Sequence, residues 1–172
     1  MHSVSPEIPA PAHPSDSVST PRLRIAGARD LDLLLRLEEP CFEEARRDSR
    51  ATIRRALRHE SDEVWVVDAD EGLIQGSLVL RHLRKGLRLY SLAVHPETRG
   101  YGLGNFLLDK AIARGTESSS PCLFLEADAG LPGLLNWYER HGFTRDRFLP
   151  DFYAPGHDAW RLKLCLRPAT QP

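Results

Sequence analysis

Lysine is nearly absent from this chain of 172 residues, which carries three lysines against twenty arginines and a formal net charge of -1. A protein that binds nucleic acid through an overall basic field needs a large positive excess. The near-neutral charge therefore argues against nucleic acid as a partner. The preference for arginine is also what a GC-rich genome would produce, so it indicates no ligand by itself.

Cysteine and long apolar runs are scarce as well. The three cysteines, Cys41, Cys122 and Cys165, form no CxxC pair, which argues against a zinc site and for a reducing compartment. No run of about 18 apolar residues could span a membrane. Residues 1–20 contain no apolar segment typical of a secretory signal. We therefore expect a cytoplasmic protein with no metal and no membrane partner.

The composition changes once along the chain. Residues 1–20 are rich in proline and serine and have almost no large apolar side chains, so burial cannot offset the entropy lost on ordering them. This predicts a disordered tail at 1–20 and one domain at 21–168. A chain of this length buries enough surface to hold a core without disulfides.

Hydrophobic spacing predicts an α/β fold in two halves. The first half has strands at 22–25, 64–68, 73–83 and 87–94, with one helix starting near Asp30 and a second, capped by Asp48 or Ser49, that runs through His59. The second half alternates: a helix at 102–114 with Gly115 just past its end, a strand at 122–127, a helix at 131–141, and strands at 143–148 and 158–166. We expect a mostly antiparallel, mixed seven-stranded sheet flanked by about four helices.

A glycine-rich loop is the most informative segment. The strand ending at Val94 leads into a loop with Gly100, Gly102 and Gly104, and then directly into a helix. Glycines allow a ligand close to the backbone, N–H groups at a helix start favour an anion, and Arg99 adds a positive charge. The loop lacks the lysine of a P-loop and the third glycine of a dinucleotide fingerprint. It predicts a phosphate or pyrophosphate cradle; a connection without a ligand is the alternative.

Two further side chains have the chemistry that acyl transfer to an amine requires. Glu126 stands near the carboxyl end of an apolar strand, and Tyr138 lies twelve residues later in the next helix. A carboxylate can remove a proton from an ammonium ion, directly or through a water, and a phenol can protonate a departing thiolate. The alternatives are an arginine ion pair for Glu126 and a core position for Tyr138.

Together these segments resemble the GNAT N-acetyltransferases. The spacing Arg99-x-x-Gly102-x-Gly104 after Leu92-Ala93-Val94 is similar to motif A of that family, and residues 136–143 are similar to its helix end before Gly-Phe. The resemblance covers about residues 22–166 and implies acetyl-CoA as cosubstrate. It implies that the loop amides bind pyrophosphate and that the strand edge binds the pantetheine arm. The implied binding residues are Leu92, Ala93, Val94, Arg99, Gly100, Tyr101, Gly102, Leu103, Gly104 and Asn105.

A narrower likeness concerns the catalytic pair. Residues 123–127 resemble the glutamate-bearing strand of RimI-type ribosomal-protein alanine N-acetyltransferases, which implies Glu126 as general base and Tyr138 as general acid. Residues 151–160 resemble the segment beside the acceptor groove in that subfamily. Peptidase-associated GNAT domains share residues 88–94 and 151–162 about as well. Asp128 and Leu131 depart from the RimI type, which has arginine and asparagine there.

We therefore expect an acetyl-CoA-dependent N-acetyltransferase that acts by direct transfer in a ternary complex. The expected acceptor is a peptide or protein N-terminus, because an α-amine with a pKa of about 7.7–8.0 loses its proton more readily than lysine at about 10.4. A small amine or amino acid as acceptor, and a catalytically silent CoA-binding module, are the alternatives. The arginine-rich stretch 46–58 is either a surface for an acidic partner or a solvated helix face. A monomer or homodimer is expected.

Overall fold

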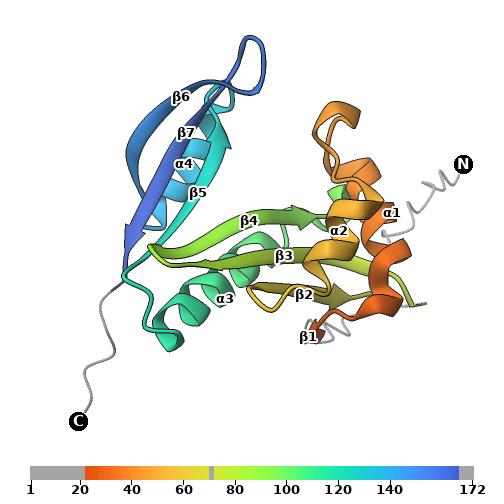
Figure 1. The fold of residues 1–172 in the computed structure, drawn as a ribbon. Helices are drawn as coiled ribbons and strands as arrows, with labels where there is room; N and C mark the ends of the chain where they lie inside the picture. The colour runs from red at the N-terminus through yellow and green to blue at the C-terminus, as the bar shows by residue number, and fades with distance from the viewer. Residues whose placement is uncertain (1–21, 70–71, 167–172) are drawn as a thin grey trace, which may run out of the picture.

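A seven-stranded mixed sheet forms the centre of the protein, as seen in the computed structural model, which describes residues 22–69 and 72–166 (Figure 1). The predicted tail at 1–20 lies outside the described residues. The strand order is β1-β2-β3-β4-β5-β7-β6, and β4 and β5 run parallel while the other neighbours are antiparallel. The strands are β1 (Arg22–Ile25), β2 (Asp62–Asp68), β3 (Ile74–Leu83), β4 (Gly86–Val94), β5 (Cys122–Asp128), β6 (Thr144–Ala154) and β7 (His157–Cys165).

Helices cover both faces of the sheet, which confirms the predicted fold class. They are α1 (Leu31–Cys41), α2 (Arg50–Ala56), α3 (Leu103–Glu117) and α4 (Pro132–Arg140), with 3-10 turns η1 (Ala28–Asp30), η2 (Glu44–Arg46) and η4 (Pro96–Thr98). One core cluster packs α3 and α4 against the sheet, and a second packs α1 and α2 against the opposite face. In the described part of the chain, no helix is long and apolar enough to cross a membrane.

The two parallel strands part early, and this opening positions the site. β4 and β5 pair only at Leu87 with Leu123 and at Arg88 with Phe124. The register between β3 and β4 also shifts at this point: Leu80 faces Leu89 and Val79 faces Ser91, so Tyr90 is an extra, bulged residue. A bulge bends its strand and redirects the side chains after it. From Leu89 onward, the edge of β4 that faces β5 is unpaired and borders a cavity.

Several boundaries differ from the sequence prediction, three of them by more than two residues. Helix α3 continues to Glu117, so Gly115 lies inside it and not past its end. A Cβ at Gly115 would come within 2.4 Å of Leu166 Cδ1, so the leucine side chain would have to move to make room for it. Helix α2 is shorter than expected, although Ser49 caps it as predicted by accepting from Thr52 N–H. Strand β6 continues through Pro150 because it is an edge strand, where proline removes no required hydrogen bond.

Candidate active site

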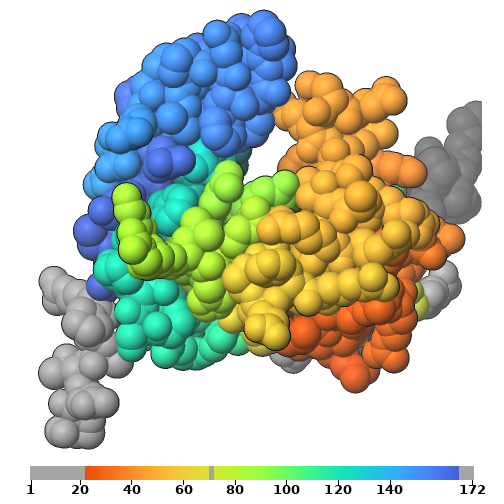
Figure 2. Space-filling model, viewed as in Figure 1, coloured from red at the N-terminus to blue at the C-terminus, as the bar shows by residue number. Residues whose placement is uncertain are grey.

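A cavity of about 1180 Å³ occupies the opening between β4 and β5. Its walls come from both faces of the sheet: the start of α3 and part of α4 on one side, and the α1–α2 connection with the β6–β7 hairpin on the other. In Figure 2 the blue β6–β7 hairpin and the orange α1–α2 segment stand on either side of a hollow, with green β4 at its floor. The cavity therefore joins two faces of one sheet.

The glycine-rich loop forms the α3 side of the cavity. Gly100 and Gly102 have φ angles of +86° and +85°, a left-handed conformation that glycine adopts without strain, and neither has another atom within 4 Å of an added Cβ. Gly102 is the N-cap of α3 and supplies no side-chain cap, so the first N–H groups of a 15-residue helix have no side-chain partner there. This combination fits the pyrophosphate of a nucleotide-like cosubstrate.

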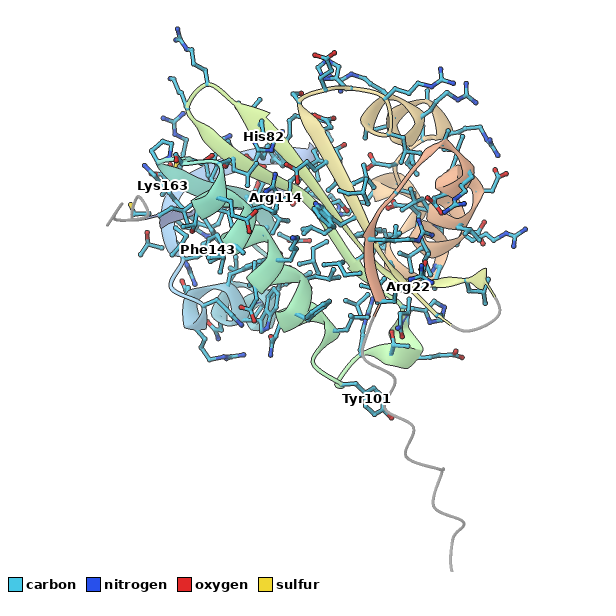
Figure 3. The ribbon with its side chains drawn as sticks, turned by 90° about the horizontal axis from the view of Figure 1, so that it is seen from below. Arg22, His82, Tyr101, Arg114, Phe143 and Lys163 are labelled. Carbon is cyan, nitrogen blue, oxygen red and sulfur yellow. The ribbon has the colours of Figure 1, made fainter. Side chains whose placement is uncertain are left out.

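Most of the predicted binding residues line this cavity. Two do not: Leu103 is buried in the core, and Tyr101 is 87% exposed at the tip of the loop, where Figure 3 shows it projecting away from the helices. Arg99 turns toward the strand, because its Nε donates to the Val94 carbonyl at 3.1 Å. The predicted residues that line the cavity are Leu92, Ala93, Val94, Arg99, Gly100, Gly102, Gly104 and Asn105.

Glu126 lies on the opposite face, with both carboxylate oxygens engaged. In β5 it alternates with the core residues Leu125 and Ala127, so its side chain points to the α1–α2 face. Arg88 approaches Oε2 with Nε at 2.9 Å and Nη2 at 2.7 Å, and Arg161 approaches Oε1 with Nε at 3.0 Å and Nη2 at 2.9 Å. The carboxylate is only 4% exposed.

These four contacts occupy about as many hydrogen bonds as one carboxylate can accept. Glu126 therefore has both properties considered from the sequence: it lines the cavity and it is ion-paired to arginines. It can accept a proton from an acceptor or a water only after one guanidinium contact gives way. Arg161 is the more exposed partner, at 33% against 24% for Arg88.

Tyr138 lies in α4 on the other side of the opening. Its ring packs edge-on against Trp137 and Phe143 in the main core. Among the described residues no hydrogen bond to its hydroxyl is formed, and no fully buried side-chain polar atom lacks a partner, so the hydroxyl is open to the cavity. Burial raises the pKa of Tyr138 above its ordinary value. The phenol thus stays protonated at neutral pH and available as a donor.

Asp128, the reversed charge in the sequence comparison with the RimI type, connects the two walls. Its Oδ2 lies 2.6 Å from Nη2 of Arg46 in η2, and that guanidinium also stacks 4.6 Å from the centre of the Tyr153 ring. Tyr153 in turn donates from its hydroxyl to the Glu126 carbonyl at 3.1 Å. Burial is the main cause that raises the pKa of Tyr153 to about 12.

Sequence reasoning missed a second acidic group on this face. Glu38, at the end of α1, is 8% exposed and lines the cavity. Its Oε2 accepts from Asp48 N–H at 2.9 Å, and Asp48 Oδ1 accepts from the Tyr90 hydroxyl at 2.9 Å. Burial raises the pKa of Glu38 to about 7. The sequence did contain a signal, because Glu38 falls on the apolar face of α1 with Leu34 and Leu37.

The arginine-rich stretch does not form one surface. Arg46 lies in η2 and pairs with Asp128, Arg47 donates to the carbonyls of Phe42 and Glu39, and Arg50 pairs with Asp32. These arginines hold local structure together, which leaves only the later ones, on and after α2, on an exposed helix face.

Comparison with known proteins agrees with the family resemblance seen in the sequence. A model of the family described as "Acetyltransferase (GNAT) family" matches residues 31–143. N-alpha-acetyltransferase 30 of Xenopus laevis is 41% identical over 76 residues, which cover 44% of this chain and 28% of the relative. The chain thus spans less than a third of the length of that relative.

Many solved structures share the fold, and two of them illustrate it. The ribosomal-protein-S18-alanine N-acetyltransferase of Escherichia coli has a TM-score of 0.77 at 20% identity, covering 87% of this chain and 96% of that one. The NatC complex bound to Gag peptide and CoA contains a chain with a TM-score of 0.72 at 22% identity, covering 85% and 98%. At these identities the likeness concerns the fold alone.

Proposed function

Because the chain belongs to the GNAT acetyltransferase family, we propose that it transfers the acetyl group of acetyl-CoA to the α-amine at the N-terminus of a peptide or protein. One observation carries the proposal: the opening between β4 and β5 joins an uncapped helix start on one face to a groove with carboxylates on the other. A cosubstrate and an acceptor can enter from opposite faces and meet without a covalent enzyme intermediate.

On the α3 face, the chain offers what acetyl-CoA requires. The first amides of α3 and the loop Arg99–Asn105 would bind the pyrophosphate, and the unpaired edge Leu92–Val94 would pair with the pantetheine arm. The bound cosubstrate supplies an activated acetyl thioester. A backbone N–H at the end of β4, such as that of Val94, would polarise the thioester carbonyl.

Glu126 on the acceptor face and Tyr138 on the other side of the opening are the proposed catalytic pair. Glu126 would take a proton from the attacking amine through a water, once a contact to Arg161 has opened. Tyr138, whose hydroxyl is open to the cavity, would protonate the departing thiolate. Burial raises the pKa of the Cys41 thiol, which makes an acetyl-cysteine route unfavourable.

The acceptor class rests on chemistry and on the relatives. An α-ammonium loses its proton more readily than a lysine side chain, and the relatives named above are described as N-alpha-acetyltransferases or bound to a peptide. The groove is bordered by Tyr153 and the α1–α2 connection, where an extended peptide N-terminus would lie. We propose that the protein acts in the cytoplasm as a monomer or homodimer.

The test is an acetylation assay read by mass spectrometry. The chain is incubated with acetyl-CoA and a panel of peptides with free N-termini. The controls are matched peptides whose α-amine is blocked and whose only free amine is a lysine side chain. We expect one acetyl group on the α-amine of a subset of the free peptides and none on the blocked ones. Acetylation of small amines alone, or CoA binding without any turnover, would contradict the proposal in favour of its two alternatives.

Glu126→Gln and Tyr138→Phe test the catalytic pair. Loss of a positioned acid or base costs roughly 10²–10⁴ in rate, so we expect a fall of that order in kcat with CoA binding retained in calorimetry. Full activity in both variants would show that the catalytic groups lie elsewhere.

A further inference from the structure

Acetylation of an ammonium ion requires two protons to leave the nitrogen. The first must leave before attack, because an ammonium nitrogen has no lone pair, and the second leaves as the amide forms. The departing thiolate takes up one proton, and the other is released from the site. Glu126 and Tyr138 account for one donor and one acceptor, so the proposed reaction leaves one proton without an acceptor on the protein.

Most carboxylates of the acceptor face are already engaged. Both oxygens of Glu126 are held by arginines, and Asp128 pairs with Arg46 and also accepts from Gly130 N–H at 2.7 Å. Burial opposes ionisation of Asp128, but these partners lower its pKa. As the structure stands, neither carboxylate has a free position, and Glu126 gains one only when a guanidinium contact opens.

Glu38 is different, because it is buried and only one of its two carboxylate oxygens has a hydrogen-bond partner among the described residues. Its Oε2 holds Asp48 N–H, whereas Oε1 has no partner among the described residues. No fully buried polar side-chain atom of the described residues is unpaired, so Oε1 is open to the space that Glu38 lines. Three residues further along the same helix, Cys41 Sγ lies 3.4 Å from the Val94 carbonyl, at the end of β4 where the thioester is expected.

A second, smaller cavity lies behind Glu38. It has a volume of about 20 Å³, and its polar lining comes from Glu38, Asp48, Ser77 and Tyr90. Most of its lining is apolar, from α1, α2, β2 and β3, so it offers few partners for an ordered water. Glu38 therefore lines both cavities, and the side chains around most of the smaller one are apolar.

We infer that Glu38 accepts the first proton of the acceptor ammonium through a water of the large cavity. An N–H bond of the ammonium breaks, its electron pair stays on nitrogen, and an O–H bond forms at Oε1. After attack a guanidinium contact of Glu126 opens, the second proton passes to Glu126, and Tyr138 protonates the thiolate. The proton on Glu126 then returns through water to the Tyr138 phenolate. Glu38 then releases its proton to solvent. This inference rests on the proposed acetyl transfer and assigns a proton acceptor that the resemblance did not imply.

The groups around Glu38 suit that task. Asp48, from the segment before α2, adds a negative charge, and Tyr90, from β4, stays protonated because burial raises its pKa to about 12. Arg47 acts in the opposite direction, but its guanidinium is engaged with two backbone carbonyls. With its pKa near 7, Glu38 can exchange a proton with an α-ammonium close to neutral pH and is poorly matched to lysine.

The test compares pH profiles of kcat/KM for the whole chain and Glu38→Gln, with a peptide bearing a free α-amine. Glutamine keeps an oxygen for Asp48 N–H, so the loop anchor is retained. We expect a fall of about 10–100-fold at pH 7, and a much smaller one near pH 9, where the acceptor arrives without its extra proton. Glu39→Gln, an exposed neighbour on the same helix, is the matched control and should behave as wild type.

A direct measurement complements the kinetics. A carboxyl ¹³C NMR titration, with Glu38→Gln used to assign the signal, should show one glutamate titrating near pH 7. An unchanged profile in Glu38→Gln, or a loss of equal size at every pH, would overturn the role of Glu38. If wild type acetylates no amine, the proposed function itself fails, and the inference fails with it; a fall in CoA affinity in Glu38→Gln would also count against it.

Discussion

Two carboxylates on the same face of the sheet sit in opposite environments, and the individual residues around them explain the difference. Glu126 is surrounded by two guanidinium groups, whereas Glu38 is surrounded by apolar helix residues, one backbone N–H and a neighbouring acid. Ion pairs favour the charged form of a carboxyl group, and burial without a cation favours the neutral form. Environments that differ in this way divide proton-handling roles between chemically similar groups.

The pairing of Glu126 predicts a specific coupling in stability. Arg161→Gln leaves a buried carboxylate with one partner fewer, which should lower the free energy of unfolding by about 1–3 kcal/mol. In a Glu126→Gln background, Arg161→Gln should lower the free energy of unfolding clearly less, because residue 126 then carries no charge that could lose its partner. Urea denaturation measures both. Arg145→Gln, which removes an exposed pair with Glu139 of comparable length, is the control and should cost about 0–1 kcal/mol. Equal costs in both backgrounds would contradict the coupling.

Glu38 predicts a pH dependence of stability. Its pKa is about 7 in the folded protein against an ordinary value of 4.5, so the folded state binds the proton more tightly. The stabilising contribution is complete below pH 4.5 and is lost as the pH rises through about 7, and by pH 7 the loss amounts to about 3 kcal/mol. Glu38→Gln should lack this loss, so that its unfolding free energy falls less than that of wild type across pH 4.5–7. Parallel curves for the two proteins would show that Glu38 titrates normally.

At the scale of elements, the sequence was sufficient for the strands, for the loop before α3 and for the helix cap at Ser49, because these depend on local spacing and local backbone chemistry. The sequence was insufficient where the structure of one segment depends on packing against a segment far away in the chain. Gly115 packs inside α3 against Leu166 from the end of the chain, and the arginine partners of Glu126 come from β4 and β7. The parting of β4 from β5 is likewise a property of two strands and leaves no mark in either one.

Gly102, the N-cap of α3, has a left-handed conformation that favours glycine. Gly102→Ala places a Cβ on a residue with φ of +85°, which costs about 1–2 kcal/mol, and it adds bulk to the proposed pyrophosphate cradle. We expect a lower melting temperature and weaker CoA binding in calorimetry. Gly133→Ala in α4, where φ is not positive and no atom lies within 4 Å of the new Cβ, should keep CoA affinity and be neutral or stabilising by up to about 1 kcal/mol. Matching CoA affinities for the two variants would exclude a cradle at Gly102.

At the scale of the whole molecule, two blocks meet across the cavity. One contains α1, α2 and β1–β4, and the other contains β5–β7 with α4. They are joined by a short stretch of β4–β5 pairing and by the core beneath α3, which packs on both. Across the acceptor side, the ion pair of Arg46 with Asp128 and the stacking of Arg46 on Tyr153 tie the walls together. The width of the acceptor groove therefore depends on a few polar contacts.

Removing that tie should loosen the groove with little effect on stability. Asp128→Asn weakens a partly exposed pair, so we expect a loss of about 0–1 kcal/mol and faster amide hydrogen exchange in residues 42–48. Asp146→Asn, an exposed change on β6, serves as the control and should leave exchange in that segment unchanged. Unchanged exchange in Asp128→Asn would mean that the α1–α2 connection is held by other contacts.

The central claim is that acetyl-CoA and a peptide amine meet in the opening between β4 and β5. A crystal structure with a bisubstrate compound, in which CoA is joined through an acetyl bridge to the α-nitrogen of a peptide, tests it most directly. We predict pyrophosphate at the start of α3, the bridge beside Val94 between the parted strands, and the peptide beside Glu126 and Tyr153 on the opposite face. A compound bound outside this opening, or a peptide lying on the α3 face, would contradict the account.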